Sequence, residues 1–253
     1  MPVAASAATS ASAVASAPAV DLDAVLGAAV SGLVGHFAVA VTDPAAGTDA
    51  VWGEDSFVTA SIVKVDILAA LLLRTGGELT DGQRSAAALM IEQSDNDAAT
   101  ALFEAAGGAS GLDEANAAFG LTATVAGTDG YWGLTSTTAA DQVRLLRAVF
   151  TEDSPLTSDS RTYLRQLMGQ VVDGQDWGVS AADQGGAAQL KNGWLPRTST
   201  GLWVVNSIGR IDYGGRELLV SVVSDGSATQ EDGIALVESV ASAAVRAFAS
   251  THG

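Results

Sequence analysis

The order of periodic segments constrains the fold of this chain more than any single motif does. Strand-like alternation occurs near both ends, at residues 36–41 and 49–52 and again at residues 187–190, 202–211 and 217–223. The long stretch between these groups has the apolar spacing of helices. Because only the outer segments can pair, we expect an α/β (α+β) fold, with a five-stranded antiparallel sheet and an inserted all-helical lobe.

Helical periodicity also flanks the sheet at both ends of the chain. Asp21 is a suitable N-cap for a helix that ends near Leu33, and a long helix spans residues 230–250. We expect one domain at residues 21–253, with residues 21–60 and 187–253 as the α/β part and residues 61–186 as the helical part. Helices are expected at residues 61–73, 79–93, 97–106, 112–119, 138–150 and 158–171, an irregular segment at 120–135, a helix stop at Gly107-Gly108 and a hairpin turn at Tyr213-Gly214-Gly215.

The composition argues against several classes of function. A formal net charge of −17 disfavours binding to nucleic acid or to anionic membrane surfaces, and the chain has no cysteine. His36 and His252 are its only histidines, and their positions suggest structural roles, so a Ser-His-Asp triad or a histidine-rich metal site is not expected. No stretch looks long and apolar enough to span a membrane. We therefore expect no metal, cofactor, nucleic-acid partner or membrane span; the oligomeric state is left open.

The first 20 residues differ from the rest of the chain. They are almost all Ala, Ser, Val, Thr and Pro, and they lack the basic start and leucine-rich stretch of an intact signal peptide. We expect a flexible tail. Ala15-Ser16-Ala17 has the small-x-small pattern of a cleavage site, which alanine-rich tails also produce by chance. Our hypothesis is an exported protein, secreted or at the exterior of the cell envelope, whose signal segment has been removed.

Lysine is used in only two places. The chain has ten arginines but two lysines, and each lysine lies in a short motif. Lys64 ends Ser61-Ile62-Val63-Lys64, so on a helix it shares a face with Ser61. A serine needs a base to act as a nucleophile, and a lysine whose pKa is lowered by burial can be that base. The alternative is a lysine that reaches solvent beside a capping serine.

A second motif, Ser94-Asp95-Asn96, falls between two expected helices. Ser94 is a candidate for carrying a proton to a leaving group. Asn96 is a candidate for holding Lys64 and for bonding a substrate amide. The alternative is an ordinary cap for the helix that follows.

The third motif, Lys191-Asn192-Gly193, is expected to end an apolar strand. A lysine here supplies positive potential for substrate and proton relay, and a glycine lets a ligand backbone approach the strand. The amide of Trp194 is a candidate partner for that of Ser61 in an oxyanion hole. The alternative is a strand-edge lysine followed by a turn glycine.

Together, the three motifs resemble the S-x-x-K, S-D-N and K-T-G set of the β-lactamase and penicillin-binding protein superfamily, and class A β-lactamases most closely. The likeness runs from about Asp21 to the last helix and includes residues 98–106 and 134–138. The chain also resembles actinobacterial exported serine hydrolases of this type. The resemblance implies a transpeptidase-like α/β fold and an acyl-serine intermediate. The residues it implies are Ser61 as nucleophile, Lys64 as acylation base, Ser94 and Lys191 as proton relay, and Asn96, Asn192, Gly193 and Trp194 at the substrate.

The chain departs from the class A pattern before its third motif. Ser61 and Ser94 are only 33 positions apart, too few for the longer segment that carries an aromatic residue at the site in class A enzymes. No glutamate lies between Glu114 and Glu152, so the loop glutamate that drives water onto the acyl-enzyme is absent. Asp129, beside Tyr131, is either a substitute base or a turn aspartate.

The third motif departs from the pattern as well. Asn192 replaces the Thr or Ser whose hydroxyl helps to bind a substrate carboxylate, and Arg197 or Arg210 could compensate. Trp194 is bulky for the position after the glycine, and its side chain could narrow the cleft.

These features predict an active-site serine hydrolase or acyltransferase that acts on a small-molecule or peptide acyl substrate, a β-lactam or a peptidoglycan-like amide. Without a deacylation base the acyl-enzyme at Ser61 should persist, which argues against efficient β-lactam hydrolysis. The alternatives are a penicillin-binding or D-alanyl peptidase-like protein, a transacylase that uses a nucleophile other than water, a binding module without turnover on the same fold, and a purely structural secreted protein.

Overall fold

The sheet predicted from the two ends of the chain is present. The computed structural model describes residues 20–251, so His252 and all but the last residue of the expected tail lie outside the described residues. In the described part, β1 (His36–Asp43), β2 (Thr48–Trp52), β5 (Gln189–Pro196), β6 (Trp203–Tyr213) and β7 (Arg216–Asp225) form one sheet. Their order is β2-β1-β7-β6-β5, and every neighbouring pair is antiparallel. The predicted fold class is confirmed.

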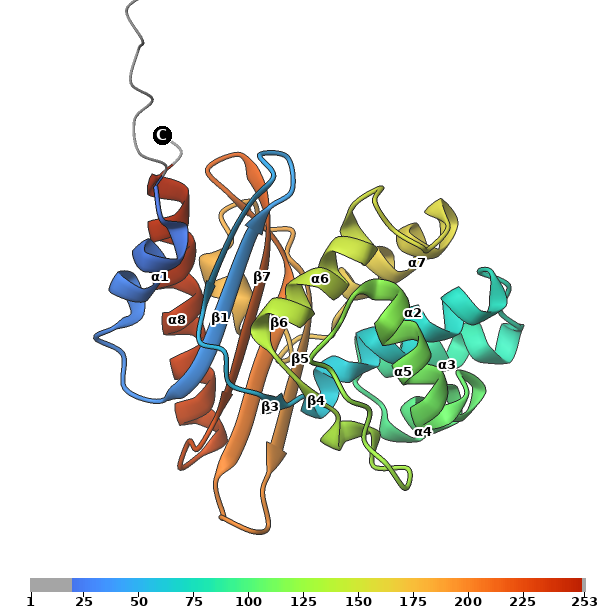
Figure 1. The fold of residues 1–253 in the computed structure, drawn as a ribbon. Helices are drawn as coiled ribbons and strands as arrows, with labels where there is room; N and C mark the ends of the chain where they lie inside the picture. The colour runs from blue at the N-terminus through green and yellow to red at the C-terminus, as the bar shows by residue number, and fades with distance from the viewer. Residues whose placement is uncertain (1–19, 252–253) are drawn as a thin grey trace, which may run out of the picture.

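Helices cover both faces of this sheet (Figure 1). On one face lie α1 (Leu22–Val30) and α8 (Gln230–Ser250), and on the other lies the helical lobe. The lobe contains α2 (Val63–Thr75), α3 (Asp81–Glu92), α4 (Asn96–Ala105), α5 (Gly108–Phe119), α6 (Ala139–Phe150) and α7 (Ser158–Met168). Alternation along β7 sends Val222 into the core under α8 and Val223 into the core under the lobe.

Side-chain caps define several helix starts. The Asp21 carboxylate accepts a hydrogen bond from the amide of Ala24 at 3.1 Å, as its predicted role as N-cap requires. Thr138 and Thr229 cap α6 and α8 in the same way. These caps place a hydrogen-bonding side chain where the periodic pattern begins, which is why the sequence locates these helix starts within one or two residues.

The strand that carries Lys191 is longer than predicted. The sequence placed its end at Leu190, but β5 continues to Pro196, so the Lys191-Asn192-Gly193 motif lies within the strand. Asn and Gly have low strand propensity, which hid the extension. Pairing with β6 imposes it, since Lys191 is opposite Ile208 and Gly193 is opposite Asn206.

Three short elements near the first motif were not predicted. β3 (Phe57–Val58) pairs with β4 (Ser136–Thr137), and two-residue strands are too short for alternation to reveal them. Ser61 lies in a 3₁₀ turn, η1 (Ala60–Ile62), and not in the first turn of the long helix as predicted. The nucleophile candidate therefore directly precedes α2.

By length and composition α8 could cross a membrane, contrary to the expectation that no segment could. Its 21 residues contain a window of mean hydropathy 1.3, of which 39% is buried. In the structure α8 packs against α1, β6 and β7. Val237, Val240 and Phe248 belong to the core beneath the sheet. Its contacts are those of a core helix.

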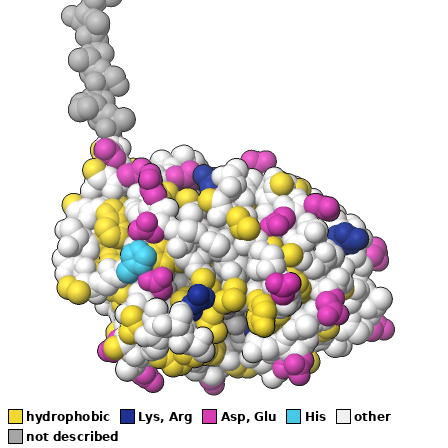
Figure 2. All heavy atoms as spheres, turned by 60° about the horizontal axis from the view of Figure 1, so that its bottom comes forward, with side chains coloured by type: hydrophobic (Ala, Val, Ile, Leu, Met, Phe, Trp, Pro, Cys, Tyr) yellow, Lys and Arg dark blue, Asp and Glu magenta, His cyan; other side chains and the backbone are white. Residues whose placement is uncertain are grey.

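The surface reflects the acidic composition. Figure 2 shows acidic side chains spread over one face of the molecule, with few Lys or Arg among them. His36, at the start of β1, contacts Asp225 at 2.6 Å and Asp55 at 3.2 Å, and its ring stacks on Phe57. The hydrogen bond to Asp225 raises the pKa of His36. These contacts link β1 to the residues around it and fit a structural role for His36.

Candidate active site

The third motif lies directly against the first. A Cβ added to Gly193 would lie 2.6 Å from the amide nitrogen of Ser61 and 2.7 Å from that of Ile62. No side chain fits such a gap, so the glycine permits strand β5 to run beside η1. Ser61, from the helical lobe, is thereby brought to the edge strand of the sheet.

A buried asparagine on β6 fixes the backbone ahead of Ser61. The Asn206 amide donates to the carbonyl oxygens of Val58 at 2.8 Å and Thr59 at 2.9 Å, and its oxygen accepts from the amide of Ser224 at 2.9 Å. Ala60, which links Thr59 to Ser61, has a φ of 47°, which non-glycine residues rarely adopt. Asn206 was not predicted as a site residue. Its signal in the sequence is a lone amide within an apolar strand.

The second motif encloses the amine of Lys64. Lys64 Nζ donates to the carbonyl oxygen of Ser94 at 2.6 Å, to Ser94 Oγ at 3.1 Å and to Asn96 Oδ1 at 2.7 Å. Ser94 has a φ of 58°, so its backbone is bent to present both oxygens. Asp95 caps α4 through the amide of Ala98 at 2.7 Å. The motif therefore caps a helix and binds Lys64 at the same time.

Both lysines are poorly hydrated, which favours their neutral forms. Burial lowers the pKa of Lys64 to about 8, partly opposed by the charge of Asp95. Burial, with the nearby charge of Lys64, lowers the pKa of Lys191 to about 7. Burial also raises the pKa of the Asp66 carboxyl, on α2, well above its ordinary value.

The contacts of Lys64 allow it to exchange a proton with Ser94. A protonated lysine has three N–H donors, and the three acceptors on Ser94 and Asn96 use them all. When Lys64 is neutral, the Ser94 hydroxyl can turn and donate to the nitrogen lone pair. Among the described residues, no hydrogen bond joins Ser61 Oγ to Lys64 Nζ. Such catalytic contacts often tighten only when substrate binds.

Comparison with known families agrees with this arrangement. The model of the beta-lactamase enzyme family matches residues 78–248, more than half of the chain. The chain belongs to the β-lactamase enzyme family. The matched range includes the Ser94 and Lys191 motifs and begins after Ser61. Comparison with curated proteins gave no match.

Solved structures of β-lactamases, class A enzymes among them, have the same fold. The enzyme from Bacteroides cellulosilyticus aligns with a TM-score of 0.76 and 18% identity, over 91% of this chain and 98% of its own. The enzyme from Burkholderia vietnamiensis aligns with a TM-score of 0.75 and 21% identity, over 93% and 99%. An ancestral class A β-lactamase of Gram-negative bacteria aligns with a TM-score of 0.73 and 24% identity, over 89% and 99%.

Within this β-lactamase-family fold, Asn192 does not present its side chain to Ser61. Residues alternate along β5, so Gly193 faces η1 and Asn192 faces the opposite side. The Asn192 amide is fully buried and donates to the carbonyl oxygens of Gln175 at 2.8 Å and Trp177 at 2.7 Å. Asn192 therefore fastens the segment that precedes β5. This position argues against the predicted contact of its side chain with substrate.

The side chain of Trp194 also points away from Ser61. It packs against Trp177, with ring centroids 5.9 Å apart, on the face of the sheet that α8 covers. The expectation that this indole narrows the cleft is therefore not supported. Its backbone amide, next to Gly193, stays the candidate second donor of an oxyanion hole.

The irregular segment before β4 brings an aromatic ring to Lys64 instead of an acid. The ring of Trp132 lies over Lys64, with its centroid 5.1 Å from Nζ, a contact that was not predicted. Asp129 is exposed, has a φ of 54° and accepts from the hydroxyl of Thr128 at 3.3 Å. Asp129 thus has the geometry of the turn aspartate that the sequence offered as one alternative.

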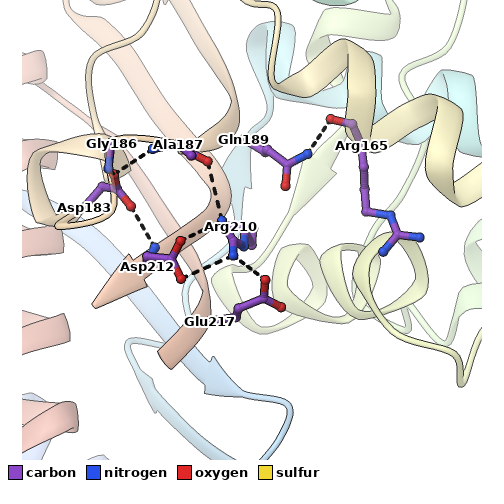
Figure 3. A network of polar contacts seen from close by, with 8 residues as sticks. All are labelled: Arg165, Asp183, Gly186, Ala187, Gln189, Arg210, Asp212 and Glu217. Carbon is purple, nitrogen blue, oxygen red and sulfur yellow. Dashed lines mark hydrogen bonds and ion pairs between the residues drawn. The ribbon is translucent and has the colours of Figure 1, made fainter. Parts of the chain in front are cut away.

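Neither candidate arginine is placed as a carboxylate ligand by its contacts. Arg210 contacts Asp212 and Glu217 and donates to the carbonyl oxygen of Ala187 (Figure 3). Its guanidinium is therefore already neutralised. Arg197 follows β5, where its backbone closes the turn to β6 through Leu202, and its guanidinium forms no ion pair with a described residue.

We predict that Gly193→Ala lowers the acylation rate at Ser61 at least about a hundredfold. A displacement of a reacting group by about 1 Å can slow a reaction by that factor. The added methyl would force β5 and η1 apart. Acylation is measured by intact-protein mass spectrometry after a timed exposure to an acyl donor. Gly32→Ala is the matched control, since a Cβ there meets nothing within 4 Å. A Gly193→Ala protein that acylates at the original rate would contradict this geometry.

We predict that Lys191→Met stabilises the protein by about 1–3 kcal/mol while abolishing acylation, because a buried amine is replaced by an apolar chain of similar size. The folded-state pKa of Lys191 lies below its ordinary value. The free-energy cost of burying this amine on folding is therefore largest below about pH 7 and fades toward pH 10.5. The gain should therefore be larger at pH 6 than at pH 9. Urea unfolding at both values measures it. Lys191→Arg, which cannot lose its proton, should destabilise; a destabilised Lys191→Met would indicate a structural lysine.

Proposed function

We propose that this protein is an active-site serine hydrolase or acyltransferase that forms an acyl-enzyme at Ser61. The observation that carries the proposal is the position of Lys64. Its amine is fully buried, is held by Ser94 and Asn96, and has a pKa lowered to about 8 within one turn of Ser61. A lysine in this state is a competent general base near neutral pH.

The acylation step follows from these positions. Neutral Lys64 accepts the proton of Ser61 as Oγ attacks the substrate carbonyl, and the C–N bond of the substrate then breaks. The amides of Ser61 and Trp194 are the proposed donors to the oxyanion that forms during attack. Ser94 donates a proton to the leaving nitrogen and recovers one from Lys64, 3.1 Å away. Lys191 relays protons together with Ser94, and Asn96 orients the substrate amide.

The proposed substrates are β-lactams or peptidoglycan-like amides. Membership of the β-lactamase enzyme family and the likeness to class A β-lactamase structures support this class. No carboxylate of the described residues bonds to Ser61 or Lys64, which supports a long-lived acyl-enzyme. That observation favours a penicillin-binding or D-alanyl peptidase-like activity, or transfer to another acceptor, over rapid hydrolysis. Export of the protein, with Ser61 acting outside the cytoplasm, is part of the proposal.

Intact-protein mass spectrometry over time, after addition of a penicillin, tests the proposed function. We expect wild-type protein to gain the mass of the drug and to keep it for hours, and Ser61→Ala to gain none. An adduct that clears with release of opened drug would mean efficient hydrolysis. If a penicillin, a peptide ester and p-nitrophenyl acetate all leave Ser61 unlabelled, the acyl-enzyme proposal is wrong and a binding module without turnover is favoured.

We predict that the acylation rate rises with pH, with a midpoint near the pKa of about 8 of Lys64. Lys64 must be neutral to accept the Ser61 proton, so the rate should increase about tenfold per pH unit below the midpoint. Stopped acylation reactions from pH 6 to pH 9, read by mass spectrometry, give the profile. Lys64→Gln should remove both the rate and its pH dependence. A flat wild-type profile would exclude Lys64 as the base.

A further inference from the structure

The segment at residues 127–135 is held rigidly beside η1. The hydroxyl of Thr135 donates to the carbonyl oxygen of Trp132 at 2.7 Å and accepts from the amide of Gly127 at 3.1 Å. The carbonyl of Thr135 accepts from the amide of Thr59 at 2.8 Å, two residues before Ser61. A Cβ on Gly127 would lie 2.1 Å from the carbonyl oxygen of Tyr131, so this loop closes on itself without space.

This rigid loop delivers the indole of Trp132 to the second motif. Trp132 starts the 3₁₀ turn η2 (Trp132–Leu134), which packs against η1. Its Nε1 donates to the hydroxyl of Thr100 at 3.1 Å, and that hydroxyl donates to the carbonyl oxygen of Asn96 at 3.0 Å. The ring is therefore anchored to α4 at one edge while its face lies over Lys64 Nζ, 5.1 Å from the centroid.

The position of the ring explains how Lys64 is kept from water. The Lys64 side chain has 0% exposure, although Ser61 is half-buried and Asn96 is exposed. Protein groups satisfy its three N–H donors, and the indole covers it. The indole occupies the surface of Lys64, so a water molecule that attacks an acyl group on Ser61 has little access to this base.

No acid is placed to take over that role. Asp95 is bound to the amide of Ala98, Asp113 to the amide of Ala126, and Asp141 to Thr124 and Arg144. Asp129 is held in its own exposed turn. These four carboxylates are therefore committed to structural contacts.

We propose that Trp132 is a positioning residue that shields Lys64 from water and so limits hydrolysis of the acyl-enzyme at Ser61. The inference rests on the proposed acyl-enzyme at Ser61. In the step that Trp132 limits, water adds to the ester carbonyl, the bond to Ser61 Oγ breaks, the acyl group leaves as a carboxylic acid, and Oγ recovers a proton. Exclusion of water from a closed site is an established way to protect a reactive intermediate.

The test measures hydrolysis apart from acylation. Wild type and Trp132→Ala are acetylated with p-nitrophenyl acetate, freed of reagent by rapid desalting, and followed by the loss of the acetyl mass. We expect Trp132→Ala to lose its acetyl group about tenfold faster than wild type or more, because water gains access to Lys64. Trp132→Phe, which keeps a ring face over Lys64, should stay within about threefold of wild type.

Two variants separate shielding from a loss of structure. Tyr131→Ala removes the neighbouring aromatic ring, which is 65% exposed, and should leave the loss of the acetyl group unchanged. Trp132→Leu repeats the measurement with a larger apolar residue if the alanine variant does not fold. A variant that is merely destabilised acylates less but does not deacylate faster.

The outcomes distinguish the two proposals. If wild-type Ser61 forms the ester but Trp132→Ala and Trp132→Leu lose it no faster than wild type, the role of Trp132 is wrong while the acyl-enzyme stands. If Ser61 forms no ester with p-nitrophenyl acetate or a penicillin, both proposals fail together. Faster loss in the alanine variant, with the phenylalanine variant near wild type, supports shielding.

Discussion

The close approach of strand β5 to the turn that carries Ser61 is the constraint on which the site depends. The amide nitrogens of Ser61 and Ile62 lie 2.6 and 2.7 Å from the position that a Cβ of residue 193 would take, so the two backbones meet without an intervening side chain. Asn206, from the neighbouring strand, holds the two carbonyl groups ahead of the turn. The sheet therefore determines the position of a serine that belongs, in sequence, to the helical lobe. Lys64 follows, because it is one helical turn away.

The restricted use of lysine has a physical explanation in this structure. Both lysine side chains are fully buried, and burial lowers the pKa of Lys64 to about 8 and that of Lys191 to about 7. An arginine at either position could not become neutral, because its guanidinium keeps its proton in proteins. Surface cations have no such requirement, and in this chain all of them are arginines. Residue choice thus separates the two buried amines, which can become neutral, from the surface guanidinium groups, which keep their charge.

The sequence predicted most of the fold because its elements are long and regular. The five strands of the sheet, the hairpin at Gly214-Gly215 and the long helix α8 all follow from local periodicity. The ends of β5 did not follow, since pairing with β6 overrides the low strand propensity of Asn192 and Gly193. The side of the sheet to which the Asn192 and Trp194 side chains point could not be predicted either, because the sequence did not place these residues within the strand. Asn206 and Trp132 contact residues far away in the chain, so even the lone amide in the apolar strand marks Asn206 without indicating its partners.

The pairing of β1 with β7 affects how the chain can fold during synthesis. His36 lies opposite Asp225, so the first strand finds its central neighbour only when nearly the whole polypeptide has been made. At roughly 5–20 residues per second this delay is on the order of ten seconds or more. Contacts of such long sequence separation also form slowly. The nascent chain therefore stays without its complete sheet during this period, and the helical insertion that carries Ser61 also sets the length of that interval.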